Sequence, residues 1–407
     1  MSQNPPPTAG PITAPRLRDW LAGTVLPFWE TTGFDSRHGA FFEKLDLDGT
    51  VSSEDYTRLR VQARQIYVYA HAGVLGLSTD GLARAHDAFD FLRRHAWDAQ
   101  HGGWFHRLRR DGQPLDRTRD FYDHAFMLLA LAWLYRASGE GEVLQAVRKT
   151  TAFLDENLRL ERGGTFDGYA EQRGEEASQM PTRRRQNPHM HLFEALLALH
   201  EATGDAEWIE RAASIRGLFD AHFFSAENGQ LAEFFDADWR EMPVDGRFIR
   251  EPGHHFEWVW LLHRYGQLSG DDGVLPAMEG LFGWAWAQGI DRRAEGIFGA
   301  YDAVDPEGQV LQGGSKRLWP QTEALKACLA LAERSGHPAA AAGIAPLLQS
   351  FFTHFVGLDH ALWQDQFDGA GAMIAKAVPA SSLYHLFLAI AEVLRVWPSL
   401  PAQRGAP

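Results

Sequence analysis

The sequence is poor in cysteine and in long apolar runs, and each shortage excludes a class of protein. Cys328 is the single cysteine among 407 residues, so an intramolecular disulfide framework and a multi-cysteine metal site are both ruled out. No segment approaches the roughly 18 uninterrupted apolar residues of a membrane span. The first fifteen residues, MSQNPPPTAGPITAP, are rich in proline and lack the apolar stretch of a signal peptide. We therefore expect residues 1–14 to be a disordered leader and the compartment to be the cytoplasm.

Positive charge is also scarce. The chain has 39 lysines and arginines against 53 aspartates and glutamates, for a net charge of −14. Such a chain repels polyanions, so we expect neither nucleic acid nor a membrane as a partner. The sequence also has no Gly-rich phosphate loop after a predicted strand and no G-x-S-x-G nucleophile elbow. These features favour a protein, monomer or homodimer, that acts on a neutral small molecule.

What the sequence does contain is an internal repeat. Residues 36–49 (SRHGAFFEKLDLDG) and 99–112 (AQHGGWFHRLRRDG) both place a glycine before an aromatic residue, alternate apolar and polar residues, and end in Asp-Gly. That pattern is typical of β-hairpins. Four weaker copies follow, and the anchor residues of the six copies are 61 to 67 residues apart: Gly39, Gly103, Gly164, Gly229, Gly296 and Ala361.

Two helical patterns separate each hairpin from the next. One set begins with polar residues, and most of its members stop at glycine: 64–76, 123–139, 189–204, 254–270, 321–336 and from 382 onward. The second set comprises 19–32, 82–97, 143–158, 206–222, 274–288 and 338–355. Each pair is too small to bury its own apolar face, so the pairs must pack on one another.

We therefore predict an all-α fold, an (α/α)6 barrel with six inner helices, six outer helices and short β-hairpins at one rim. It would form one domain over residues 15–400. An open superhelical solenoid is the alternative. Closure is favoured because the six inner helices all begin with polar or ionisable residues, which would then converge at one mouth.

The starts of the inner helices carry the candidate functional residues. They supply histidines, carboxylates, an arginine and indoles, a set that suits proton transfer on a sugar. The indole of Trp319, just before a proline at a helix mouth, suits the apolar side of a sugar ring. In chain order the candidates are Arg64, Tyr122, Asn187, His191, His254, Glu257, Trp319, Gln321, Glu323 and His385.

Several of these residues also have a purely structural interpretation. For His124, His189 and His255, a core role and a functional role are equally consistent with the pattern. His189, His191 and Glu194 could be metal ligands by residue type. However, residues two apart on a helix point about 200° away from each other, so His189 and His191 cannot face one ion. We predict no metal and no cofactor.

Five ordered motifs resemble the N-acylglucosamine 2-epimerase superfamily over nearly the whole chain. They are VQARQIY (61–67), NPHMHLFEALLAL (187–199), EPGHHFEWVWLL (251–262), RLWPQTEALKA (317–327) and VPASSLYHLF (378–387). With the last of these, the sequence is most similar to the bacterial mannose isomerase branch. The resemblance implies an (α/α)6 barrel, no obligatory metal, and two histidines that move protons at C2 and C1 of a sugar.

Matched motif by motif, the resemblance places the catalytic pair on His254 and His385. It places substrate-binding residues at Arg64, Asn187, His191, Glu257 and Glu323, with Trp319 and Gln321 beside the last, and Tyr122 by a shorter match. The activity it implies is isomerisation of D-mannose to D-fructose, and of D-lyxose to D-xylulose, through a cis-enediol.

Three alternatives remain open from the sequence. A sugar 2-epimerase acting on mannose, cellobiose or N-acylglucosamine would use the same two histidines. A glycoside hydrolase would need two carboxylates across a glycosidic bond, with Glu251, Glu257, Asp302 and Glu323 as candidates. A binding module without turnover is disfavoured because His254 and His385 are both present.

Overall fold

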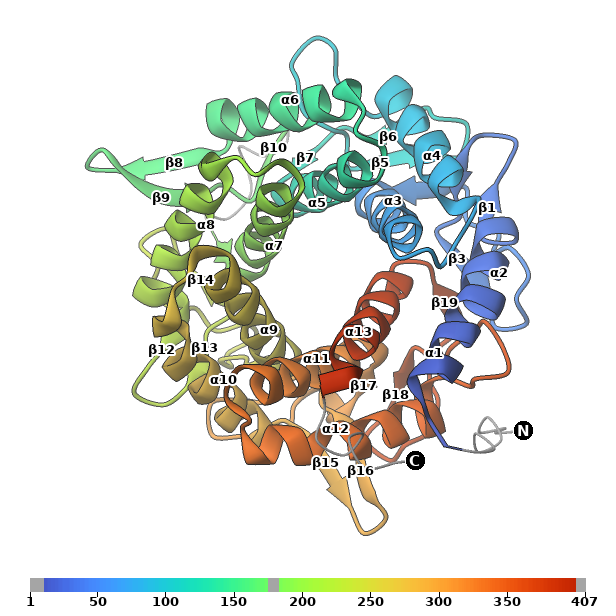
Figure 1. Ribbon diagram of the computed structural model, residues 1–407. Helices are drawn as coiled ribbons and strands as arrows, with labels where there is room; N and C mark the ends of the chain where they lie inside the picture. The colour runs from blue at the N-terminus through green and yellow to red at the C-terminus, as the bar shows by residue number, and fades with distance from the viewer. Residues whose placement is uncertain (1–10, 175–182, 400–407) are drawn as a thin grey trace.

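Six helices form a closed inner ring. The computed structural model describes residues 11–174 and 183–399. Within them each inner helix contacts the next, and the last contacts the first, as Figure 1 shows. The predicted (α/α)6 barrel is confirmed, and the open solenoid is excluded. The inner helices are α3 (Leu59–Val74), α5 (Phe121–Ser138), α7 (Gln186–Thr203), α9 (Pro252–Ser269), α11 (Leu318–Ser335) and α13 (Ser382–Val396).

The outer helices surround this ring. The five outer helices from α4 onward each pack on the inner helix that precedes them in the chain, and α1 packs on the last inner helix, α13. Turns of wider π geometry, η1 (Leu21–Val25), η3 (Phe219–Phe223) and η6 (Phe351–Phe355), join α1 to α2 and extend α8 and α12. Short 3-10 turns are η4 (Asp272–Val274), η5 (Gln312–Gly314) and η7 (Trp397–Ser399). The outer helices are α1 (Ala14–Trp20) with α2 (Leu26–Thr31), α4 (Gly81–His95), α6 (Gly141–Asn157), α8 (Ala206–Leu218), α10 (Leu275–Gln288) and α12 (Pro338–Ser350).

The inner helices end where the local sequence signals predict, but α3 begins earlier than predicted. Gly204, Gly270 and Gly336 end their inner helices in the left-handed conformation, with φ of 75°, 74° and 64°, as predicted. The start of α3 is five residues earlier than predicted, because strand β4 leads directly into it, so Arg64 lies in the second turn. Residues 1–10 of the predicted leader, and residue 400, lie outside the described residues.

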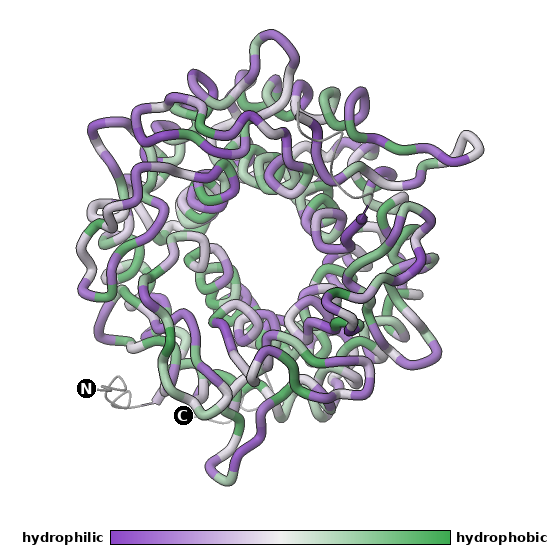
Figure 2. Tube along the Cα trace, turned by 180° about the vertical axis from the view of Figure 1, so that it is seen from behind, coloured by the Kyte–Doolittle hydropathy of each residue, from purple (hydrophilic) through white to green (hydrophobic). Residues whose placement is uncertain are grey.

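A hairpin or a single bridge follows each outer helix. The paired strands are β1 (Phe34–Asp35) with β2 (Ala40–Phe41), β8 (Arg159–Arg162) with β9 (Thr165–Tyr169), β12 (Phe224–Ser225) with β13 (Gln230–Leu231), and β15 (Ile290–Arg293) with β16 (Gly296–Ala300). Bridges Trp97–Trp104 and Val356–Trp363 take the remaining two places. Seen from the side opposite to Figure 1, long loops cross in front of the helices (Figure 2).

Neighbouring units are tied together by a second set of pairs, each just before an inner helix. They are β4 (Tyr56–Arg58) with β5 (Arg107–Arg109), which also pairs with β6 (Pro114–Asp116); β7 (Arg119–Asp120) with β10 (Gln172–Arg173); β11 (Arg184–Arg185) with β14 (Phe234–Phe235); the bridge Arg250–Val304; β17 (Lys316–Arg317) with β18 (Gln366–Phe367); and β19 (Ala377–Pro379) with β3 (Lys44–Asp46). Because β19 belongs to the last unit and β3 to the first, the pairing closes the rim as the helices close the ring.

Three buried histidines attach the hairpins to the inner helices. His124, His189 and His255 each accept a hydrogen bond at Nε2 from a hairpin amide, at 2.9–3.0 Å. Each directs Nδ1 to the backbone carbonyl four residues earlier. Burial lowers the pKa of each to about 4, so all three are neutral at pH 7. The structure gives these histidines the structural role.

Glutamine takes the same position in two other inner helices. The Gln62 side chain bonds both backbone groups of Phe41, and Gln321 does the same with Ala300. Gln321 also donates to the carbonyl of Arg317, four residues earlier. The prediction that Gln321 binds substrate is therefore corrected: its amide holds a hairpin, and the side chain does not line the site described below.

This equivalence predicts which substitutions a hairpin histidine tolerates. We expect His124→Ala to lower the free energy of unfolding by about 1–3 kcal/mol, because the buried Trp104 amide loses its acceptor. His124→Gln should lose much less, since Gln62 makes the same contacts in α3. Urea unfolding of both variants measures the difference. Equal losses in the two variants would reject the structural role.

No helix among the described residues is long and apolar enough to cross a membrane.

Candidate active site

A cavity of about 290 Å³ lies where the inner helices begin, a volume suited to a small ligand. All six inner helices contribute to its wall. Eight of the ten predicted site residues line it: Arg64, Tyr122, Asn187, His191, His254, Glu257, Trp319 and His385. Glu323 lies behind this wall, and Gln321 lies in the hairpin contact described above. The lining also includes Glu251, which the sequence suggested only for a glycoside hydrolase, together with Arg317, Asp365, Pro379, Ser381 and Ser382, which were not among the predicted site residues.

His254 is held as a cation. It lies in the first turn of α9, where Pro252 starts the helix, and its Nδ1 is 2.9 Å from a carboxylate oxygen of Glu233. Glu251 lies 3.8 Å away. Burial alone would lower the pKa of His254, but the charges of Glu233 and then Glu251 raise it to about 9. At neutral pH the imidazolium therefore has Nε2–H as its second donor.

The sign of this shift gives a testable pH dependence. Because the folded pKa of about 9 exceeds the ordinary 6.5, the pair stabilises the fold fully below pH 6.5 and loses that contribution as pH rises through about 9. In Glu233→Gln the pKa of His254 should fall, so the alkaline limb of kcat/KM should move toward neutral pH. A pH–rate profile measures this. Asp236→Asn, on an exposed turn of the same loop, is the control and should leave the profile unchanged. An unshifted alkaline limb of kcat/KM in Glu233→Gln would contradict the conclusion that Glu233 raises the pKa of His254.

His385 has the opposite charge state. Its Nδ1 is 2.9 Å from Glu323, and a carboxylate only accepts, so Nδ1 carries the hydrogen. Burial, followed by the positive charges of Arg64 and Lys326, holds the pKa of His385 well below its ordinary value. The ring is neutral at pH 7, and its Nε2 is an unprotonated base.

Trp319 packs against both histidines. Its ring centroid is 5.0 Å from that of His254 and 5.7 Å from that of His385. The close approach requires Gly253, because a Cβ atom at that position would come within 2.4 Å of the indole. One indole thus sets the spacing of the two titratable rings on the cavity wall.

Arg64 brings a positive charge into the cavity without a counter-ion. Its Nη2 donates to the Tyr122 hydroxyl at 2.8 Å, and its guanidinium lies 4.2 Å from the centroid of Phe126. Among the described residues, no carboxylate forms an ion pair with it. Its Nε also has no hydrogen-bond partner there. An unpaired buried cation of this kind is costly unless an anion or a developing negative charge uses it.

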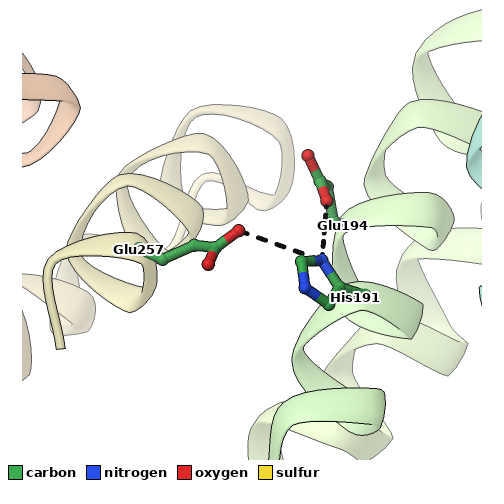
Figure 3. A group of neighbouring side chains, drawn as sticks. All are labelled: His191, Glu194 and Glu257. Atoms are coloured by element: carbon green, nitrogen blue, oxygen red, sulfur yellow. Dashed lines mark hydrogen bonds and ion pairs between the residues drawn. The ribbon is translucent and has the colours of Figure 1, made fainter. Parts of the chain in front are cut away.

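Figure 3 shows His191 between two carboxylates. Its Nδ1 is 3.2 Å from Glu194 and 3.8 Å from Glu257. The Tyr384 hydroxyl donates to the Glu194 carboxylate and lies 2.6 and 2.7 Å from its two oxygens. Burial and the neighbouring Glu323 raise the pKa of Glu257 well above its ordinary value. Glu257 therefore holds a proton more readily than an exposed glutamate does, and in its protonated form it donates as well as accepts a hydrogen bond.

The acid and histidine groups here also have the composition of metal ligands. The described residues contain three such groups, and within each group the possible ligand atoms lie within 4.8 Å of one another. The groups are His191 with Glu194 and Glu257, His254 with Glu233 and Glu251, and His385 with Glu257 and Glu323. Internal hydrogen bonds already use much of each set. His189, the other half of the His-x-His pair, points to a hairpin amide instead, as the helical geometry predicts.

Glu233 is the residue that sequence reasoning missed, although the repeat contains a signal for it. In most units, one residue of the hairpin contacts the inner helix, and an aspartate or glutamate follows it two residues later. The carboxylate of that acid accepts a hydrogen bond from the start of the inner helix. Glu43, Glu171 and Asp302 accept from the backbone amides of arginines before α3, α7 and α11, and Asp365 accepts from Ser382 at the start of α13. Glu233 is the equivalent residue before α9, and there its partner is His254.

The comparisons with known proteins decide the family. A sequence model of N-acylglucosamine 2-epimerase (GlcNAc 2-epimerase) matches residues 40–389 of the 407-residue chain. The chain belongs to this family. It is thus an enzyme of the sugar epimerase and isomerase type, and the predicted resemblance is confirmed.

Individual members of the N-acylglucosamine 2-epimerase family agree along nearly the whole chain. A mannose-6-phosphate isomerase of Rhizobium meliloti (strain 1021) is 34% identical over 395 residues, which cover 94% of this chain and 97% of the relative. A D-mannose isomerase of Pseudomonas cannabina pv. alisalensis is 30% identical, covering 96% of this chain and 95% of its own. A crystal structure of D-mannose isomerase superposes with a TM-score of 0.84 at 23% identity, over 95% of this chain and all of that one, and it shares the fold.

Proposed function

We propose that this enzyme is an aldose–ketose isomerase that converts D-mannose to D-fructose, with D-lyxose to D-xylulose as a second reaction. The observation that carries the proposal is the pair of histidines on one small cavity, one neutral with a free Nε2 and one protonated. A proton transfer between adjacent carbons needs a base and an acid of this kind. The names of the 34% and 30% identical relatives support a mannose-type substrate.

The first half of the reaction acts on the open-chain aldose. Nε2 of His385 takes the C2 proton, and the electron pair of the C2–H bond becomes the C1=C2 double bond. The carbonyl electron pair moves to O1, which takes the Nε2 proton of His254. The product is a neutral cis-enediol between a protonated His385 and a neutral His254.

The second half returns both histidines to their starting states. Neutral His254 takes the O2 hydroxyl proton as C2=O forms. The electron pair of the C1=C2 bond takes the proton from His385 at C1. The outcome is a ketose, with no net gain or loss of atoms or electrons.

The remaining wall residues fit the charges and hydroxyls of this sequence. Arg64 is placed to stabilise negative charge on O1 and O2 as the enediol forms. The Asn187 Oδ1 and Glu257 Oε1 atoms have no hydrogen-bond partner among the described residues, so sugar hydroxyls would satisfy them. The Trp319 indole offers an apolar face to the sugar ring.

A proton NMR time course with D-mannose in D2O, run with and without EDTA, tests the proposal. Fructose should form at the same rate in both samples, with deuterium at C1 wherever the transferred proton exchanges with solvent. Glucose as the first product would replace the isomerase with a 2-epimerase. Loss of turnover in EDTA would reject catalysis by histidines alone. No turnover of mannose or lyxose would reject the proposed substrates.

We also propose that the substrate is unphosphorylated. Besides histidines, the cations that line the cavity are Arg64 and Arg317, and Arg317 already binds Asp302 at 3.1 Å. The proposed mechanism uses the charge of Arg64 at O1 and O2, and Glu251 and Asp365 line the same wall, so a phosphate elsewhere on the sugar would meet carboxylates. We expect kcat/KM for D-mannose 6-phosphate to be at least about tenfold below that for D-mannose. Equal or better turnover of the phosphate would reject the neutral substrate and leave the isomerase in place.

A further inference from the structure

A fully buried lysine lies behind His385. Lys326 is one turn after Glu323 on α11, and both side chains have no exposed surface. Its ammonium is 2.6 Å from Oε2 of Glu323, while Oε1 of Glu323 binds Nδ1 of His385. On its other side the ammonium lies 4.2 Å from the ring centroid of Trp260. Lysine, glutamate and histidine thus form a line that ends at the cavity.

Lys326 is surrounded by more negative than positive groups. The carboxylates of Glu323, Glu257 and Glu194 raise its pKa against the effect of burial, so it stays charged. The charged and titratable side chains that face this line from the neighbouring helices are Arg64 and Tyr67 of α3, Tyr122 of α5, His191 and Glu194 of α7, His254 and Glu257 of α9, and Tyr384 of α13. Of these, Arg64 and His254 are the cations. Arg64 contacts Tyr122, and His254 is paired with Glu233, so neither is the ion-pair partner of Glu323.

We propose that Lys326 is a positioning residue for the proton transfer, because its ammonium keeps Glu323 ionised and so holds His385 with its hydrogen on Nδ1 and its Nε2 free. The inference rests on the proposed role of His385 as the base. It gives a function to a buried charge that the reaction itself does not use. A buried ion pair is weak evidence of a stabilising role, because well-packed neutral side chains of similar volume often stabilise a fold as much or more.

Removing the ammonium changes the proton balance in one direction. Without Lys326, Glu323 is an unneutralised buried anion beside His385, and the two together gain affinity for one proton. The proton binds either to Glu323, which then stops orienting the ring, or to His385, which then stops acting as a base. Either location inactivates the site at a pH where the native enzyme is active, so the acid limb of kcat/KM moves to higher pH.

The test is a pH titration of His385 in Lys326→Met, followed by NMR of selectively labelled histidine, with His385→Gln used to assign the signal. We expect the midpoint of proton uptake to rise by at least about one pH unit, a tenfold gain in proton affinity. The acid limb of kcat/KM for mannose should rise with it. Cys328→Ala, a neutral change on the same helix where the side chain faces α12, should shift neither.

The titration does not depend on the substrate, so it separates this inference from the proposed function. A folded Lys326→Met that titrates like the native protein overturns the role of Lys326, whatever sugar is turned over. If Lys326→Met does not fold, the charge-balanced double variant Lys326→Met/Glu323→Gln replaces it. That variant should lose kcat more than KM changes, because His385 loses its anionic acceptor. A native kcat in the double variant overturns the inference.

Discussion

Under the proposed mechanism, replacing His254 or His385 is expected to reduce kcat by about 10²–10⁴-fold, the usual contribution of a positioned acid or base. In His385→Gln the neutral Nε2 that takes the C2 proton is gone, so exchange of that proton with deuterium should stop as well. In His254→Gln the donor to O1 is gone, while the base remains. Slow deuterium exchange at C2 without ketose formation should therefore survive. Isomerisation rates and NMR of the sugar in D2O measure the two steps separately.

A matched control for both variants is present on the neighbouring helix. His189 lies on α7, two residues from His191, but binds the Tyr169 amide of a hairpin. His189→Gln should keep near-native kcat, because glutamine fills the equivalent position in α3 and α11. Near-native kcat in His254→Gln or His385→Gln would show that the wrong pair has been assigned.

Arg64→Met should lower kcat/KM by about 10²–10³-fold, or roughly 3–4 kcal/mol of transition-state stabilisation. Methionine keeps much of the length of the side chain and its contact with Phe126 but removes the charge that, under the proposed mechanism, stabilises the developing enediolate. Arg64 has no ion-pair partner among the described residues, so its removal leaves no carboxylate orphaned. We therefore expect the melting temperature to stay the same or rise while activity falls. Steady-state kinetics and thermal unfolding together measure this.

Arg60→Met is the control for Arg64→Met. Arg60 lies one turn earlier on α3, where it is 3.6 Å from Asp123, and it does not line the cavity. Its loss should lower stability slightly and leave kcat nearly unchanged. Loss of activity in Arg64→Met together with a large drop in melting temperature would instead indicate a packing role for Arg64.

Local sequence signals predicted the helices well because those signals act within a few residues. Apolar periodicity and the stop glycines Gly204, Gly270 and Gly336 placed the inner helices, and the hairpin anchors Gly39 and Gly103 do adopt positive φ, at 75° and 80°. The start of α3 was misplaced because strand β4 pairs with β5, which lies in the next unit of the repeat. Nothing near residue 59 marks that partner.

The candidate site was predicted as a set of residues but not as a set of roles. The motifs selected His254, His385 and Arg64, and the structure places all three on the wall of one cavity. They also included Gln321, whose amide is used by a hairpin. They omitted Glu233, because a carboxylate in a hairpin has no visible link to a histidine 21 residues later until the loop folds over the helix.

The sequence by itself determined the repeat, the helices and turns within each unit, and the residue types that gather at the inner-helix starts, because these depend on neighbours along the chain. Only the tertiary structure decided the charge of each histidine. His254 is protonated because Glu233 and Glu251 surround it, and His385 is neutral because burial, Arg64 and Lys326 oppose a second positive charge. A pKa depends on solvent exclusion and on charges a few ångströms away in space, and the closed ring brings those charges from helices far apart in the sequence.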